Sequence, residues 1–288
     1  NEDNKVIVFD NLADGTIENI SQHLENKNFK FIESDLSDLK KLNKAMKEVD
    51  IVFHLAANTD NRNEVTLSTD LQIKENITTT HHVLESMRIN NVKRIVFPSS
   101  FTIYGDSSKP FSETHGPLLP TSLYGASKLT GEAFISAFHY LFGIDAWIFR
   151  FSNIVGERMS HGVIFDFVQK LKQNSKQLEI LGDGNQRKPF VHVKECIDAM
   201  LYVVKREKSG LHLFNIGTTK TTTIKKIGDL VIKESGLKGV NVIYTGGNRG
   251  WINDVPVLKA NVSKLKKIGW STKLSSDEAV RLSIKELI

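Results

Sequence analysis

Apolar runs and amphipathic stretches alternate along most of this chain. The apolar runs predict buried β-strands at residues 5–10, 29–35, 50–57, 93–100, 145–153 and 211–217. Between them, amphipathic stretches predict helices near 38–48, 70–90, 122–142, 162–174, 193–206 and 223–235. Strands that alternate with helices are typical of a parallel sheet covered by helices on both faces. The pattern therefore predicts an α/β fold with a doubly wound parallel sheet.

The regular alternation ends near residue 154, where glycine-rich turns such as GDGN and GGNRG interrupt it. We expect residues 1–154 to form the sheet domain, with 190–217 adding to it. Residues 155–288 are expected to form mainly a smaller second lobe. A chain of 288 residues with 40% hydrophobic content is long enough to build both around a real core.

Charge and cysteine content exclude several classes of protein. The formal net charge is +5, from 38 basic and 33 acidic residues spread in short runs such as KKLNKAMK. No arginine-rich block or aromatic-studded basic stretch occurs, so these charges indicate solvated helix faces rather than a nucleic-acid surface. The single cysteine, Cys196, gives neither a disulfide framework nor a metal cluster, and we predict no metal site.

The apolar runs are also short. The longest have about seven residues, far fewer than the roughly 20 that a helix needs to span a bilayer. No signal-peptide pattern opens the sequence. We therefore expect a soluble cytoplasmic protein that binds neither membranes nor nucleic acids.

The predicted strands end on polar or small residues. In open α/β sheets, ligands bind at the carboxyl ends of the strands, so these positions are candidates for a binding site. Any one of them alone would more often be a helix cap or a turn former. Five strand ends of this kind in a row favour a site. They are Asp10, Asp35, Ala56 with Ala57, Ser99 with Ser100, and Asn153.

The segment SLYGASKLTGEAF adds candidate chemistry. Tyr124 and Lys128 lie four positions apart in a predicted helix, which places both side chains on one face. An ammonium near a phenol favours the phenolate, so we expect Lys128 to lower the pKa of Tyr124. Ser100 ends a strand 24 residues earlier and could donate to the same substrate oxygen. A phenol, a hydroxyl and a cation together could move a proton while a hydride leaves a carbinol carbon.

Nine motifs, in order, resemble those of the extended short-chain dehydrogenase/reductases, within them the NAD-dependent nucleotide-sugar epimerase/dehydratase group. They are DNL (10–12), ESDLSD (33–38), HLAA (54–57), Asn76 in KENITTT, SSFTIYG (99–105), YGASK (124–128), RFSNIVG (150–156), GDGNQRKPFVHV (182–193) and RGWINDVP (249–256). The resemblance covers essentially the whole chain. It implies a Rossmann-like fold with NAD as the cofactor and a nucleotide sugar, most often UDP-linked, as the substrate.

The resemblance also implies roles for individual residues. Ser100, Tyr124 and Lys128 would be the catalytic triad, and the last two would also contact NAD. Asp10, followed by Asn11, would hold the adenosine ribose, where an acid favours NAD over NADP. The remaining cofactor residues would be Asp35 and Leu36 beside the adenine, with Leu55, Ala56, Ala57 and Asn76 along the cofactor.

On the substrate side, Asn153 would contact the sugar nucleotide, and Gln186, Lys188 and Arg249 would lie beside its diphosphate. Relatives usually have an arginine and an acid where this chain has Lys188 and Pro189, with Arg187 next to them. Lysine neutralises phosphate but lacks the bidentate fork of arginine. Whether Arg187 or Lys188 faces the ligand is therefore open.

A second departure concerns the start of the chain. Relatives begin with a strand, a Gly-x-x-Gly-x-x-Gly loop and a helix, whereas no glycine precedes Asp10 here. That segment is one βα unit of about 25 residues. Because the later motifs are intact, we expect that the sequence lacks its natural N-terminus and that Asp10 is the ribose acid.

The implied reaction is epimerisation at carbon 4 of a nucleotide sugar of the UDP-glucose/UDP-galactose type, through a transient 4-keto intermediate. The alternatives are a 4,6-dehydratase, decarboxylase or reductase of the same family, or a non-catalytic nucleotide-binding protein. Dehydratases place an acidic pair directly after the catalytic hydroxyl residue, where this chain has Phe101, Thr102 and Ile103. These residues favour the epimerase.

Two further expectations follow from the resemblance. Leu258 aligns with a position where a tyrosine limits room for an N-acetyl group, although an ordinary core leucine is the alternative. Relatives also commonly dimerise through two helices that would be 70–90 and 122–142 here. We therefore expect a homodimer.

Overall fold

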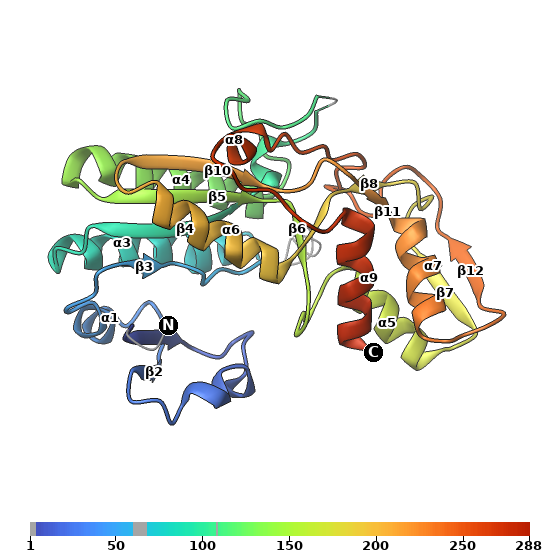
Figure 1. Ribbon diagram of the computed structural model, residues 1–288, viewed down its shortest axis with the longest axis horizontal. Helices are drawn as coiled ribbons and strands as arrows, with labels where there is room; N and C mark the ends of the chain where they lie inside the picture. The colour runs from blue at the N-terminus through green and yellow to red at the C-terminus, as the bar shows by residue number, and fades with distance from the viewer. Residues whose placement is uncertain (1–3, 60–67, 108) are drawn as a thin grey trace.

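A four-stranded parallel sheet forms the centre of the protein (Figure 1). The structure is a computed structural model that describes residues 4–59, 68–107 and 109–288. The strand order is β10 (Leu211–Ile216), β5 (Asp145–Phe151), β4 (Arg94–Ser100) and β3 (Val52–Phe53). Ser100 pairs with Phe151 and Phe151 with Ile216, so three strands end at the same edge.

Alternate residues of these strands enter two separate cores. Ile95 and Phe97 of β4 pack with helices α3 (Thr79–Ile89) and α4 (Leu123–Phe142) on one face. Val96 packs on the other face, against α6 (Val193–Arg206). This alternation buries both faces of the sheet and explains why the strands read as continuous apolar runs. The predicted doubly wound α/β fold is confirmed.

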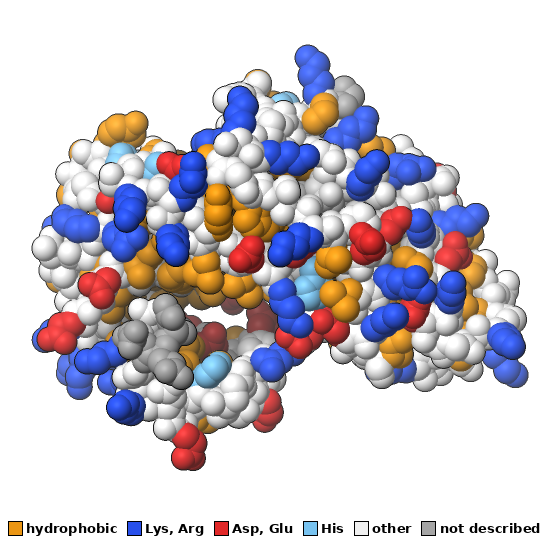
Figure 2. All heavy atoms as spheres, viewed as in Figure 1, with side chains coloured by type: hydrophobic (Ala, Val, Ile, Leu, Met, Phe, Trp, Pro, Cys, Tyr) orange, Lys and Arg blue, Asp and Glu red, His pale blue; other side chains and the backbone are white. Residues whose placement is uncertain are grey.

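The first two strands form a unit of their own. Strand β1 (Val6–Asp10) pairs in parallel with β2 (Phe29–Glu33), and the described residues form no ladder between β1 and the four-stranded sheet. The short helices η1 (Ile17–His23) and α1 (Leu39–Ala45) follow these strands. Space-filling Figure 2 shows an opening between this unit and the rest of the molecule.

The second part of the chain builds a separate apolar core from α5 (Val163–Gln173), β7 (Gln177–Ile180), α7 (Ile224–Glu234), β12 (Asn241–Tyr244) and α9 (Ser276–Leu287). The short strands that join the two parts are β6 (Asn153–Val155) with β9 (Phe190–His192), and β8 (Arg187–Lys188) with β11 (Thr222–Thr223). Helix α8 (Ser263–Lys267) lies near β10.

The structure differs from the sequence expectation at several elements. Strand β3 covers only two residues of the predicted 50–57, and 54–57 form a loop held by the bond from the His54 amide to the Val96 carbonyl (3.0 Å). The predicted helix 70–90 divides into α2 (Asp70–Gln72), a π-helical turn η2 (Ile73–Thr78) and α3. The helices η1, α8 and α9 were not predicted. Helix α9 begins with a capping box between Ser275 and Glu278 that the sequence SSDE could have revealed.

Charged side chains are mixed over the surface. Figure 2 shows lysine and arginine side chains spread among acidic ones on the face drawn, as solvated helix faces would have them. Within residues 4–59, 68–107 and 109–288, no helix is both long enough and apolar enough to cross a membrane.

Candidate active site

A cleft of about 540 Å³ lies where the sheet ends meet the second lobe. Ser100, Tyr124 and Lys128 lie on the sheet side of this cleft. The residues predicted to bind substrate that line the opposite side are Asn153, Gln186, Lys188 and Leu258. Residues predicted from distant sequence motifs are therefore brought into one cleft.

Helix α4 carries two of the three catalytic candidates. Ser122 caps this helix by accepting a hydrogen bond from the Gly125 amide (3.0 Å), so Tyr124 lies in the first turn. A Cβ atom at Gly125 would come within 2.8 Å of the Thr102 carbonyl oxygen, so only glycine allows this approach. The contact brings the start of α4 against η3 (Phe101–Tyr104), which follows Ser100. The hydroxyl of Tyr124 is hydrogen-bonded to Ser100.

Lys128 lies one turn further along α4 and is buried, with 5% of its surface exposed. Its Nζ donates to the Pro98 carbonyl (3.0 Å) and lies 4.9 Å from the centre of the Phe97 ring and 5.9 Å from that of Tyr124. Burial without a carboxylate partner lowers the pKa of Lys128 to about 8. The ammonium is held in place by backbone and aromatic faces instead of an acid.

The pKa of Tyr124 corrects one expectation. Burial raises it to about 12, and the hydrogen bond with Ser100 only partly opposes this effect. The expectation that the pKa of Tyr124 is lowered is therefore wrong for the protein without ligands, although Lys128 lies nearby. The physical reason is that desolvation of the phenolate outweighs the attraction of a cation 5.9 Å from the centre of the ring.

The predicted ribose and adenine residues lie at the ends of β1 and β2. Asp10 accepts the Leu12 amide through Oδ1 (2.7 Å), which leaves its second oxygen for a ligand hydroxyl. Asn11 donates to Asp35 (2.7 Å), and hydrogen bonds from Ser37 lower the pKa of Asp35. The free oxygen of Asp10 suits a ribose hydroxyl, as predicted, and Asp35 lies beside it at the end of β2.

Of the other residues predicted to bind the cofactor, Leu36 packs on a core, whereas residues 55–57 lie at or near the cleft. The backbone carbonyl of Leu36 is bonded to His82 (3.1 Å), and its side chain packs on the first core. Leu55 and Ala57 line the cleft, with Ala56 exposed between them.

The side chain of Asn76 fixes the loop that follows HLAA. Its amide bonds to both the backbone amide and the carbonyl of Asn58 (2.7 and 2.9 Å) and also to Ser127 (3.0 Å). These bonds attach the loop after HLAA to α4, so Asn76 positions the wall along which a cofactor would lie.

Lys188 and Arg187 point to different surroundings. Lys188 lines the cleft, forms an ion pair with Asp254 and lies 4.7 Å from the centre of the Trp251 ring. Arg187 is exposed and is not among the residues that line the cleft. The geometry thus places the lysine, rather than the neighbouring arginine, toward the site.

Arg249 directly precedes Gly250, which lines the cleft. Its guanidinium forms an ion pair with Asp106 (2.6 Å) and donates to the backbone carbonyl of Asp254. Asp106 follows η3, so this pair joins the sheet side to the second lobe. The pairing acids Asp106 and Asp254 were not predicted, because they lie 143 and 66 positions from their partners.

Several polar atoms in the cleft have no partner within the described residues. Asn153 and Gln186 donate to backbone carbonyls (3.2 Å each), but the Gln186 side-chain oxygen is buried and unpaired. Three buried hydroxyls that line the cleft are also unpaired, those of Ser99, Thr102 and Ser152. Buried polar groups usually have hydrogen-bond partners, so these atoms suit a polar ligand. The sequence indicated only Ser99 among the three hydroxyls, as a strand end.

Leu258 combines the two roles that the sequence left open. It is 9% exposed and packs with Phe101 and Phe111 in a small core, and it also lines the cleft.

Across the part of the chain that the structure describes, no three His, Cys, Asp or Glu side chains gather as a metal site would require.

Comparison with known proteins gives a consistent result. Residues 1–217 match the NAD dependent epimerase/dehydratase family. A Methanocaldococcus jannaschii protein provisionally named a UDP-glucose 4-epimerase is 34% identical over 96% of this chain and 88% of its own length. A UDP-galactose 4-epimerase structure matches with a TM-score of 0.86 and 33% identity, covering 98% of this chain and 90% of the other.

A UDP-N-acetylglucosamine 4-epimerase from Methanobrevibacter ruminantium, in complex with UDP-N-acetylmuramic acid, matches with a TM-score of 0.86 and 28% identity. The match covers 99% of this chain and 91% of the other chain. The family match confirms NAD as the expected cofactor. The chain belongs to the NAD dependent epimerase/dehydratase family.

Proposed function

We propose that this protein interconverts the 4-epimers of a UDP-hexose through a transient 4-keto intermediate. The observation that carries the proposal is the arrangement of one cleft. A hydrogen-bonded phenol and hydroxyl, with a buried lysine, lie on one side, and Lys188 lies on the other. The first group suits proton transfer at a sugar hydroxyl, and the lysine suits a diphosphate.

Each side chain has a defined task in this proposal. Tyr124 takes the proton of the sugar 4-hydroxyl, Ser100 hydrogen-bonds the same oxygen, and Lys128 stabilises the phenolate that must form. When bound, NAD supplies the hydride acceptor and, in its oxidised form, a positive charge that favours the phenolate. The 4-ketone then turns over in the cleft and is reduced on its opposite face, with Tyr124 returning the proton. Net inversion needs no further acid or base.

The residues after Ser100 favour epimerisation over dehydration. Removal of the 6-hydroxyl needs an acid and a base near carbons 5 and 6. Phe101 and Ile103 are buried in an apolar core, and Thr102 offers only a hydroxyl. None of the three can act as a carboxylic acid or a carboxylate base, so the cleft lacks at these positions the pair that dehydration requires.

The test is to incubate the purified protein and NAD with UDP-glucose or UDP-galactose and to follow the sugars by NMR. We expect the two 4-epimers to interconvert without accumulation of a 4-keto-6-deoxy sugar. That product would instead establish the dehydratase. Substrate binding with no turnover of any UDP-sugar would favour the non-catalytic protein.

We also propose that the protein acts as a homodimer. Large apolar side chains are exposed on α3 and α4, among them Ile89 (58%), Tyr140 (79%) and Leu141 (72%). Exposed apolar patches of this kind often mark protein interfaces. Light scattering of the purified protein should give twice the monomer mass, and a monomer mass at all concentrations would reject this part of the proposal.

A further inference from the structure

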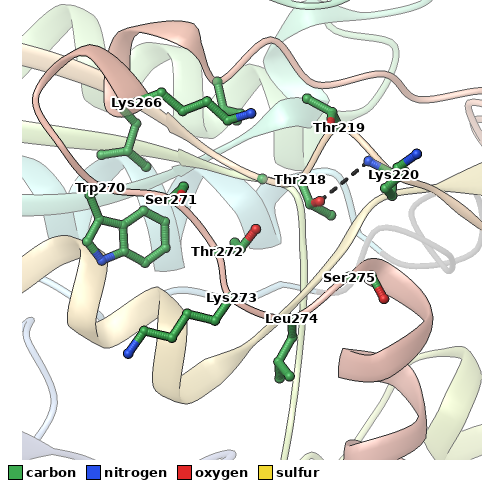
Figure 3. Close-up of a pocket in the computed structure, with 13 residues that line it drawn as sticks. Thr218, Thr219, Lys220, Lys266, Trp270, Ser271, Thr272, Lys273, Leu274 and Ser275 are labelled. Atoms are coloured by element: carbon green, nitrogen blue, oxygen red, sulfur yellow. Dashed lines mark hydrogen bonds between the residues drawn. The ribbon is translucent and has the colours of Figure 1, made fainter.

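A second pocket, of about 240 Å³, lies apart from the cleft (Figure 3). It is enclosed by the loop 217–220, which follows β10, and by the segment 270–275 between α8 and α9. No residue lines both this pocket and the cleft. Gly217 forms the boundary, since a Cβ atom there would lie 3.4 Å from Ser152 of the cleft.

The walls combine hydroxyls with an apolar floor. Thr218 and Thr272 face each other across the space in Figure 3. The other hydroxyls are those of Thr219, Ser271 and Ser275, and the apolar part consists of Val262, Leu265, Trp270 and Leu274. The indole of Trp270 is fixed by its bond to Asp198 of α6 (2.8 Å). The apolar floor is therefore held rigid by the neighbouring helix.

Among the residues that the structure describes, the charged side chains that line this pocket are all lysines, namely Lys220, Lys266 and Lys273. In Figure 3, Lys266 reaches from α8 toward the Thr219 end of the loop, whereas Lys273 points outward. Among the described residues, none of the three forms an ion pair, unlike Lys226 on α7, which pairs with Asp277.

Glu195 of α6 contacts the backbone of the segment 270–275. One carboxylate oxygen of Glu195 accepts the backbone amides of Lys273 and Leu274 (2.5 and 3.1 Å). It therefore fixes the segment 270–275 from behind. Lys220 and Lys266 therefore have no carboxylate partner among the described residues that line the pocket.

We propose that this pocket binds a small phosphate monoester. Lys220 and Lys266 would neutralise the phosphoryl group, the hydroxyls of Thr218 and Thr272 would donate to its oxygens, and Trp270 would contact the carbon part of the ligand. Lysine binds phosphate as a point charge, and hydroxyl groups donate hydrogen bonds to the phosphate oxygens. A pocket less than half the volume of the cleft excludes a whole nucleotide sugar.

Calorimetric titration of the full chain with inorganic phosphate and with glycerol 3-phosphate tests the proposal. We expect both to bind, the ester more tightly because only it reaches the apolar floor. Equal affinities would refute the monoester, and no binding of either would refute the site. Replacing both lysines (Lys220→Met with Lys266→Met) should weaken binding at least 10-fold, since each charge-assisted bond contributes about a factor of ten.

Two controls separate this pocket from the cleft. Lys267→Met changes an exposed neighbour on α8 that does not line the pocket, and it should leave the affinity unchanged. Lys188→Met should also leave it unchanged, and a loss of phosphate binding in that variant would assign the phosphate to the cleft instead. Thr272→Val provides a second test with no change in charge, and it should weaken phosphate binding several-fold without altering the thermal unfolding temperature.

Discussion

The two sides of the cleft hold their ionisable side chains in different environments. On the sheet side, desolvation moves the pKa of Tyr124 and that of the buried Lys128 toward the value that favours the neutral form. On the second lobe, Lys188 and Arg249 are each paired with a carboxylate. The ionisable groups on the sheet side therefore have perturbed pKa values. The cations on the second lobe form ion pairs, in which a ligand can replace the carboxylate.

This difference corresponds to two different tasks. Proton transfer needs groups whose protonation state changes easily when a ligand brings new charge, and burial provides that sensitivity. Binding a diphosphate needs cations, and the second lobe holds Lys188 and Arg249 in place through ion pairs with carboxylates. His54 extends the first pattern, because burial lowers its pKa to about 3 and keeps a neutral ring near Lys128.

The largest expected effect tests the sheet side. Tyr124→Phe removes the phenolic proton carrier and keeps the ring, so turnover should fall at least 10²-fold, the size typical of a general acid or base. Affinity for the UDP-sugar should stay nearly constant, because the opposite side supplies the charged contacts. Steady-state kinetics and calorimetry would check both values. Turnover close to that of the wild type would reject the proposed mechanism.

Lys128→Met should separate stability from activity. The lowered pKa means that the buried ammonium destabilises the fold by about 3 kcal/mol at pH 7. Methionine removes this penalty and loses the bond to the Pro98 carbonyl, worth about 1 kcal/mol. We therefore expect the free energy of unfolding at pH 7 to rise by about 2 kcal/mol while turnover falls, because the phenolate loses its cation.

The pH dependence of the stability gained by Lys128→Met gives a sharper test, made on protein without NAD. The folded chain releases the Lys128 proton near pH 8, but the unfolded chain keeps it until about 10.5. Wild-type stability should therefore rise with pH through that window, and the advantage of the variant should shrink. Denaturant unfolding at pH 7, 8 and 9.5 measures this change. An advantage that is constant with pH would show that the ammonium is not the cause.

The second lobe should respond in binding rather than in turnover. Lys188→Met removes a cation that lines the cleft and leaves Asp254 unpaired, so affinity for the UDP-sugar should fall about 10-fold or more. Arg187→Met removes an exposed charge outside the cleft and should change affinity less than twofold. Calorimetry on both variants checks this order. A larger loss in the arginine variant would reverse the assignment of the two side chains.

Much of the sheet side could be predicted because its information is local. The periodicity of apolar residues indicated β4, β5 and α4, and a spacing of four placed Tyr124 and Lys128 on one helix face. The strand ends then indicated which edge of the sheet would hold the site. The loop after β3 was harder, because HLAA is as apolar as a strand but only Val52 and Phe53 form a ladder.

The second lobe could not be predicted to the same depth. Its ion pairs join residues far apart in the sequence, such as Arg249 with Asp106, and no spacing rule links them. The pKa of Tyr124 also escaped prediction, because burial depends on the packing of α4 against η3 and not on the nearby lysine alone. Which of Arg187 and Lys188 faces the cleft depends on the pairing of β8 with β11, which likewise becomes visible only in the fold.

The smallest expected effect lies where the two sides meet, at Leu258. This side chain packs against Phe101 and also lines the cleft, so in the proposed complex its size would limit the space beside the sugar. With leucine there, we expect UDP-N-acetylhexosamines to be accepted beside the plain UDP-hexoses. Leu258→Tyr adds bulk at one edge of the cleft and should reduce kcat/KM for the acetylated substrate several-fold more than for the plain one.

Leu258→Met, similar in volume, is the matched control and should preserve the ratio of the two kcat/KM values. Because overpacking can destabilise a buried position, thermal unfolding of both variants shows whether the fold is intact. An equal loss on both substrates in a stable Leu258→Tyr protein would mean that Leu258 is a core residue without a role in sugar selection.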